Sequence, residues 1–84
     1  MLTVSVISAE ATLFEGQATA VIAPAFDGEV GILTNHAPMI TALGRGMLRV
    51  EDGSATQRFT VAGGFLQVVD NQVRIVTEQA SISR

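Results

Sequence analysis

The side chains with the chemistry for a reaction gather around residues 28–38, which read GEVGILTNHAP. This stretch holds Glu29 and the single histidine of the chain, His36, and it follows Asp27 directly. An imidazole close to a carboxylate can serve as the general base for a serine nucleophile. The same side chains can contribute to a cation site, or they can present polar groups to another protein.

Nucleophilic catalysis requires more than these residues provide. No serine of the chain occurs in a GxSxG motif, and several serines fall on expected strands. Thiol chemistry is excluded because the sequence contains no cysteine. We therefore expect the His36 side chain to bond to the backbone or to a partner rather than to catalyse a reaction.

Metal and cofactor sites are not indicated either. Asp27 and Glu29 are close in sequence, but a calcium loop needs three or more oxygen ligands in a DxDxDG-like run. One histidine without cysteine does not provide a zinc site. The glycine-rich segments 44–46 and 62–64 do not match the GxxxxGK[ST] phosphate loop, and the chain has no lysine. We expect no metal and no cofactor.

Composition restricts the class of partner. The 84 residues are 48% hydrophobic and 15% charged, and the net charge is −3. All basic residues are arginines that begin at Arg45, so the sequence has no basic stripe for nucleic acid or for anionic lipid. No apolar run approaches the roughly 18 residues of a membrane span. In so small a domain, the surplus of apolar residues predicts an exposed face that a protein partner covers.

Short strands are the elements that must position these residues. Turn signals recur throughout the chain, whereas no stretch has a convincing helical period, so the pattern predicts an all-β sandwich or barrel. Gly63 and Gly64 indicate a bulge or a sharp bend. Residues 39–43 (MITAL) are compatible with a helical turn too short to change the class. Turns are expected at residues 14–17 (FEGQ), 26–29 (FDGE), 51–54 (EDGS) and 70–71 (DN).

Three segments in order resemble the epsilon subunit of F-type ATP synthases. GEVGILTNHAPMITALGRGMLRV (28–50) is similar to the signature of that family, which has a glycine–acid–aliphatic–glycine run, a (Pro or Thr)-x-His-Ala-Pro loop and an Arg-containing strand. SVISAEATLFEG (5–16) resembles the opening strand and turn of the family. VAGGFLQVVDNQVRIVTEQA (61–80) resembles its closing hairpin. The resemblance covers nearly the whole chain.

The resemblance implies a flattened ten-stranded β-sandwich over residues 1–84, which is the N-terminal domain of the subunit, with no helical domain. It implies a non-catalytic subunit of the central stalk that joins the gamma subunit to the c-ring. In that role the subunit supports the coupling of proton or sodium flow to ATP synthesis. The implied location is the cytoplasmic face of the bacterial cell membrane, where the protein is peripheral and attached only through the complex.

Individual partner contacts also follow from the resemblance. Positions that face gamma in the family are matched here by Ser8, His36 and Thr41. The loop that meets the c-ring is matched by Asp27, Gly28 and Glu29. One departure is Thr34, where many members carry proline, so the loop before His36 is expected to be less restrained in φ.

A second departure concerns the end of the sequence. Most members continue into a C-terminal helical hairpin that can restrain ATP hydrolysis and in some of them binds ATP, whereas this sequence stops at Arg84. A truncated sequence and a naturally short form both stay open, and the start at Met1 without a tag favours the short form. We assign neither inhibition nor ATP binding to this chain.

Two other classes of function stay open at this point. A free-standing β-sandwich adaptor unrelated to ATP synthase would suit the composition equally well, but it gives no reason for the ordered matches. An enzyme would need a substrate-dependent role for His36 with a nearby carboxylate. Homodimers of the isolated chain through its apolar face are compatible with every non-catalytic interpretation.

Overall fold

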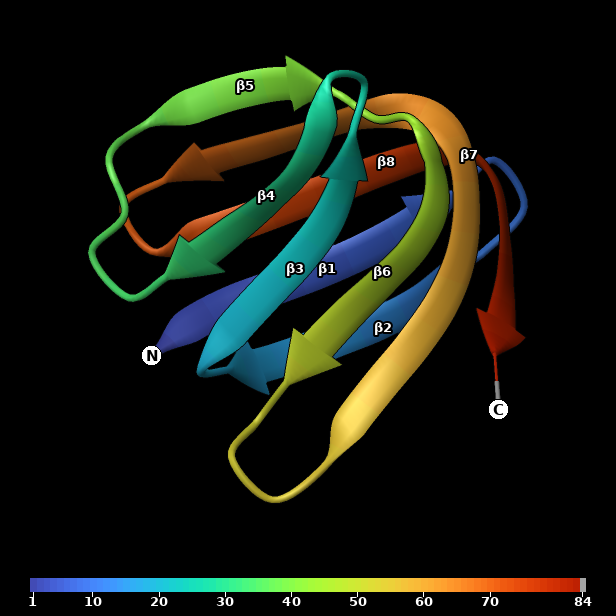
Figure 1. Cartoon of the computed structure of the whole chain (residues 1–84). Helices are drawn as coiled ribbons and strands as arrows, with labels where there is room; N and C mark the ends of the chain where they lie inside the picture. Colours follow the sequence, from blue (N-terminus) through green and yellow to red (C-terminus); the bar gives the residue numbers. More distant parts are fainter. Residues whose placement is uncertain (84) are drawn as a thin grey trace.

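The computed structural model describes residues 1–83, with side chains as far as Ile82. Within this range the chain forms eight strands and no helix, so it also contains no helix long and apolar enough to cross a bilayer. The strands are β1 (Leu2–Ser8), β2 (Thr12–Ala18), β3 (Ala20–Ala25), β4 (Gly28–Leu33), β5 (Met39–Ala42), β6 (Arg45–Glu51), β7 (Thr56–Val69) and β8 (Gln72–Ser83) (Figure 1).

A long antiparallel hairpin of β7 and β8 organises the fold. Its pairing keeps one register along the whole hairpin and ends with Val69 opposite Gln72. Asp70 and Asn71 have φ angles of 50° and 61°. Positive φ at both central residues is the geometry of a type I′ turn, whose twist matches that of the flanking strands. The turn predicted from this Asp–Asn pair is confirmed.

Gly63 and Gly64 bend this hairpin, so each of its two strands runs from one layer of the sandwich into the other. Residues 56–62 of β7 pair with β6, whereas residues 65–68 pair with β5. Residues 72–77 of β8 pair with β1, and the remainder of β8 leaves β1 and stays beside β7. One layer therefore contains β2, β1, the first half of β8, the second half of β7 and β5. The other contains β4, β3, β6 and the remaining halves of β7 and β8.

The predicted all-β sandwich is confirmed, but the chain has eight strands rather than ten. The difference arises because β7 and β8 are each continuous through the bend and each belong to both layers (Figure 1). Residues 39–42, for which a helical turn was considered, form β5.

The turn expected at residues 14–17 is wrong, because this segment lies inside β2. Phe14 is paired with Val6 of β1. Phe14 is half-buried while Glu15 and Gln17 are exposed, and this alternation is that of a half-buried edge strand. Glycine is tolerated in such a strand, so the FEGQ composition did not require a turn.

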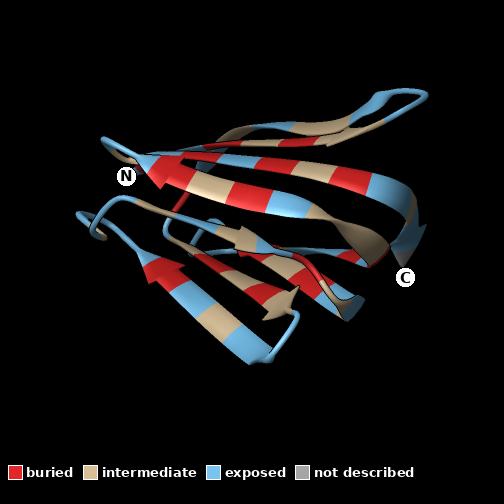
Figure 2. Ribbon diagram, turned by 90° about the horizontal axis from the view of Figure 1, so that it is seen from above, coloured by how far each residue is buried: buried red, intermediate tan, exposed pale blue. Residues whose placement is uncertain are grey.

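The core lies between the two layers and consists of alternate residues of the strands. Buried and exposed positions therefore alternate along the ribbons in Figure 2. Phe59 is the largest of the fully buried side chains. Phe14 packs edge-on against it, with 6.4 Å between the ring centroids, which is a favourable aromatic geometry. A slip of one residue would turn these side chains to solvent, so the apolar pattern fixes the register of the strands.

Close contacts hold the bend of the β7–β8 hairpin in place. The Thr77 side chain is buried, and its hydroxyl lies 3.0 Å from the carbonyl oxygen of Gly63 and 2.9 Å from that of Gln79. Leu43 donates its N–H to the carbonyl oxygen of Gly64 at 2.9 Å. A Cβ at Gly64 would overlap the backbone of Val76 and Thr77, and φ there is 105°. Only glycine suits both the space and the dihedral.

We expect Gly64→Ala to lower the free energy of unfolding by about 2–4 kcal/mol, because it combines an unfavourable φ with a backbone overlap. Urea denaturation of the chain measures this change. Gly31→Ala is the matched control, since Gly31 has no atom within 4 Å of an added Cβ. Its stability should change by less than about 1 kcal/mol. Similar small losses in both variants would contradict this account of the bend.

Asp52 shapes the turn between β6 and β7. Its Oδ1 accepts hydrogen bonds from the N–H groups of Ala55 at 2.8 Å and Ser54 at 3.1 Å, and from the Ser54 hydroxyl at 3.3 Å. The Ala55 N–H, followed by the Ser54 N–H, lowers the pKa of Asp52 below its ordinary value of 3.8. The ionised carboxylate therefore favours the folded state above that value, and this contribution disappears as the pH falls through the lowered pKa.

Asp52→Ala should therefore be less stable than the wild type at neutral pH, and the difference should shrink as the pH drops below 3.8. Thermal unfolding at roughly pH 7 and pH 3 measures both differences. Asp52→Asn keeps an oxygen acceptor but does not titrate, so its stability relative to Asp52→Ala should not vary with pH. A difference between wild type and Asp52→Ala that stays constant with pH would refute the assigned role of the charge.

Candidate functional site

His36 lies in the loop of residues 34–38 between β4 and β5. Its N–H donates to the Leu33 carbonyl oxygen at 3.1 Å, and the preceding Asn35 has a φ of 67°. The half-buried His36 ring places Nδ1 2.6 Å from the carbonyl oxygen of Ala37. A carbonyl oxygen only accepts, so Nδ1 carries a proton, and Nε2 makes no hydrogen bond to another described residue. The Nε2 edge of this ring suits a hydrogen bond with another molecule.

Ser8 lies at the end of β1, where its hydroxyl is occupied by the turn into β2. The hydroxyl donates to the Ala11 carbonyl oxygen at 3.2 Å and accepts from the N–H groups of Ala11 at 3.2 Å and Glu10 at 3.3 Å. Ser8 therefore contributes the shape of this turn rather than a free hydroxyl. It also lines a shallow pocket of about 380 Å³ beside Phe65 and Val76.

Thr41 is half-buried on β5, opposite the buried Leu66 of β7. Residues opposite each other in a sheet share a face, so the Thr41 side chain lies on the side of β5 that faces the other layer. Its neighbours Ile40 and Ala42 are exposed. The outward surface at this predicted contact is therefore apolar.

An apolar row crosses the outside of this layer. Ala42 is opposite Phe65, Phe65 is opposite Val76, and Val76 is opposite Ile7, so the row spans β5, β7, β8 and β1. We call Ile7, Ile40, Ala42, Phe65 and Val76 the outer apolar face. Ile40 is 69% exposed and Phe65 is 36% exposed. Exposed apolar patches are a common feature of protein–protein contact sites.

The outer apolar face agrees with the expectation from composition, but the sequence did not identify its members. They come from separate strands and become neighbours only through the register of the sheet. Phe65 and Val76 of this face also line the pocket beside Ser8. Ser8, one of the predicted contact residues, therefore lies next to the outer apolar face.

Asp27, Gly28 and Glu29 are all exposed at the turn between β3 and β4. The Glu29 carboxylate lies 3.8 Å from the guanidinium of Arg49, and the two side chains are 62% and 38% exposed. Such an exposed ion pair contributes little to stability. Phe26, which the sequence analysis did not select, is 72% exposed at the same turn. This turn therefore presents carboxylates and an aromatic ring.

The structure separates the two polar groups that the sequence places in one stretch. Glu29 is near the start of β4, and His36 follows the end of that strand (Figure 1). β4 has six residues, and each residue of a strand advances it by about 3.3 Å. The His36 ring and the Glu29 carboxylate therefore lie at opposite ends of the strand and do not form an acid–base pair.

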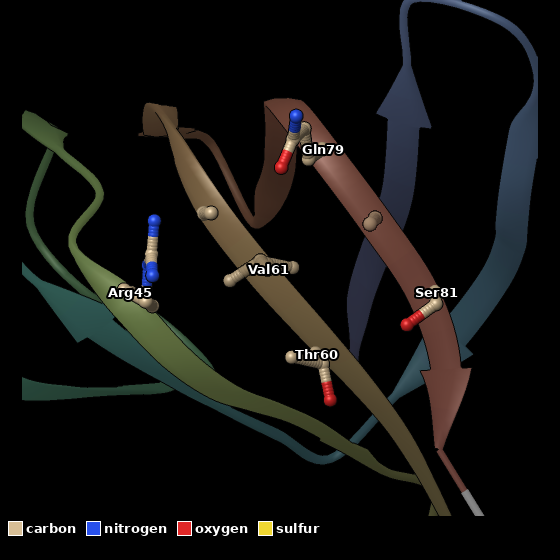
Figure 3. A pocket seen from close by; sticks show the side chains of 7 residues that line it. Arg45, Thr60, Val61, Gln79 and Ser81 are labelled. Carbon is tan, nitrogen blue, oxygen red and sulfur yellow. The ribbon is translucent and has the colours of Figure 1, made fainter.

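A groove of about 400 Å³ crosses β6, β7 and β8, and the residues that line it include none of the predicted contact residues. Figure 3 shows Arg45 on one side of it and Gln79 and Ser81 on the other, with Thr60 and Val61 between them. The described lining contains a guanidinium and hydroxyl groups, but neither an imidazole nor a carboxylate. Residues 1–83 also contain no group of three or more His, Cys, Asp or Glu that could hold a metal ion.

Comparison with known sequences identifies the family. The family model for the ATP synthase, delta/epsilon chain, beta-sandwich domain matches residues 1–83. The ATP synthase epsilon chain of Leptospira borgpetersenii is 41% identical over 81 residues, which cover 96% of this chain and 64% of that protein. The epsilon chain of Synechocystis sp. is 38% identical over 81 residues, which cover 96% and 60%. The chain thus spans less than two thirds of the length of these relatives.

Solved structures agree with the sequence relatives. A chain in the Euglena gracilis mitochondrial ATP synthase, in an OSCP/F1/c-ring structure, matches with a TM-score of 0.89 at 25% identity, covering 96% of this chain and 52% of that chain. A chain from the central stalk and c-ring of the Tetrahymena thermophila mitochondrial ATP synthase shares the fold, with a TM-score of 0.79 at 17% identity and coverage of 95% and 65%. The resemblance to the epsilon subunit is confirmed, and the chain belongs to the family of the ATP synthase delta/epsilon chain β-sandwich domain.

Proposed function

We propose that this chain is a non-catalytic rotor domain that joins the gamma subunit to the c-ring of an F-type ATP synthase. In this role it supports the coupling of proton or sodium flow to ATP synthesis. One observation carries the proposal beyond family membership. The outer apolar face and the turn of residues 27–29 are separate surfaces on one sandwich, and a joint between two partners needs two such surfaces.

The gamma subunit is assigned to the outer apolar face and the loop that leads into β5. An apolar patch with polar groups at its rim is the usual composition of a stable protein interface. His36 lies in the loop that leads into β5, the strand that carries Ile40 and Ala42. Ser8 contributes the turn beside the pocket, and Thr41 contributes the backbone between Ile40 and Ala42.

The c-ring is assigned to the turn that carries Asp27, Gly28 and Glu29. Polar loops of a ring would meet exposed carboxylates there. The ion pair between Glu29 and Arg49 is long and exposed, so little energy is lost when the Glu29 carboxylate turns to a donor on a partner.

The proposed location follows from these partners. The domain would be peripheral at the cytoplasmic face of a bacterial cell membrane and attached only through the complex, with no cofactor of its own. A non-catalytic role is supported by the distance between the His36 ring and the Glu29 carboxylate. Family membership favours this role over an adaptor unrelated to ATP synthase.

The test of this function is native mass spectrometry of the chain mixed with the gamma subunit of the same organism. A one-to-one complex that survives moderate salt is the expected result. If no complex forms while circular dichroism shows a folded chain, the proposed role is wrong and the family match describes the fold alone.

His36→Ala should weaken gamma binding by roughly three- to tenfold, because one hydrogen bond at Nε2 is lost. Isothermal titration calorimetry measures the affinity, and circular dichroism verifies that the fold is intact. Gln57→Ala, at an exposed position of β7 in the other layer, is the control and should bind like the wild type. Unchanged affinity of His36→Ala would remove His36 from the interface.

Glu29→Gln should weaken binding to the c-ring in a reconstituted complex and leave gamma binding unchanged, because it removes the carboxylate from the turn. Arg49→Gln breaks the same ion pair from its other end and leaves that carboxylate in place. It should therefore weaken ring binding less than Glu29→Gln. Equal losses for the two variants, or a parallel loss of gamma binding, would show that the ion pair serves the fold instead.

A further inference from the structure

We propose that Asn71, in the turn between β7 and β8, is a positioning residue that holds the loop carrying His36 in the conformation that binds the gamma subunit. The inference rests on the gamma contact proposed above. It assigns to the turn a role in binding although Asn71 itself need not touch the partner.

Two reciprocal hydrogen bonds join the Asn71 side chain to the loop. Asn71 Oδ1 accepts from the Asn35 N–H at 2.6 Å, and Asn71 Nδ2 donates to Asn35 Oδ1 at 3.2 Å. The carbonyl oxygen of Asn71 also accepts from the Thr3 N–H at 2.8 Å. Asn71 therefore ties together the turn, the loop and the start of β1, and the two asparagines are 36 positions apart in sequence.

The loop depends on this contact because it has few other restraints. Thr34, Asn35, Ala37 and Pro38 are exposed, so they add little packing against the core. Asn35 has a φ of 67°, in the left-handed region that asparagine visits more often than most residues with a Cβ, with support from local hydrogen bonds. The hydrogen bonds from Asn71 supply that support.

Holding Asn35 also fixes the direction of the next residue. Asn35 is joined directly to His36, so its backbone conformation determines where the imidazole lies. A loop that is already ordered loses less conformational freedom when it binds a partner, and this raises affinity without any new contact. The Asn71 side chain thus contributes to binding by preparing the loop in the free chain.

Asn71→Gly tests this role with little damage to the turn. Glycine adopts the φ of 61° at this position without strain, so the substitution mainly removes the two side-chain hydrogen bonds. Asp70→Gly is the matched control, because Asp70 has a positive φ in the same turn and its side chain makes no hydrogen bond with another described residue. Asn71→Asp is the conservative variant, because it keeps an oxygen for the Asn35 N–H.

Three measurements separate positioning from a general loss of stability. These are the hydrogen exchange rate of the Asn35 amide in the free chain, the thermal midpoint, and the affinity for the gamma subunit. We expect Asn71→Gly to speed Asn35 exchange at least tenfold and to weaken gamma binding about five- to tenfold. Its thermal midpoint should match that of Asp70→Gly. Asn71→Asp should recover most of the affinity.

The outcomes distinguish this inference from the proposed function. Unchanged Asn35 exchange in Asn71→Gly would show that the side chain does not hold the loop, and would overturn the inference. Faster Asn35 exchange in Asn71→Gly with unchanged gamma affinity would also overturn the inference. The proposed function would still stand in that case, because the wild type binds gamma. If the wild type itself does not bind gamma, the proposed function fails, and the role of Asn71 in positioning the loop for binding fails with it.

Discussion

The bend in the β7–β8 hairpin is the constraint on which the rest of this structure depends. One hairpin supplies strands to both layers, so the position of one layer relative to the other is set by covalent continuity and by the contacts at the bend. Those contacts are the close approach of Gly64 to the backbone of β8 and the bonding of the buried Thr77 hydroxyl. A side chain at Gly64 would separate the strands at the point where they change layer.

A fixed relation between the layers gives the molecule two surfaces that do not move independently. The outer apolar face lies on the layer that contains β5 and β1, whereas the turn with Glu29 extends from β3 and β4 in the other layer. Force applied at one surface is therefore transmitted to the other through strands that share one core. This arrangement suits the proposed joint between two partners better than it suits a site for chemistry.

Polar side chains outside the core mostly serve the local backbone. The Ser8 hydroxyl closes the turn after β1, the Asp52 carboxylate closes the turn after β6, and the Asn71 amide holds the loop beside it. In the structure their hydrogen-bonding capacity is used by nearby N–H and C=O groups, and what they control is the shape of two turns and one loop.

The sequence by itself determined the all-β class, the tight turn at Asp70 and Asn71, the bend at the glycine pair and the family. Each of these depends on local dihedral preferences or on the alternation of apolar residues along one strand. The tertiary structure alone decided that Glu29 and His36 lie at opposite ends of β4, that Phe65 and Val76 join one apolar row, and that Asn35 meets Asn71. These features depend on which strands pair and in which register, and that pairing is settled by burial of the whole core rather than by any one segment.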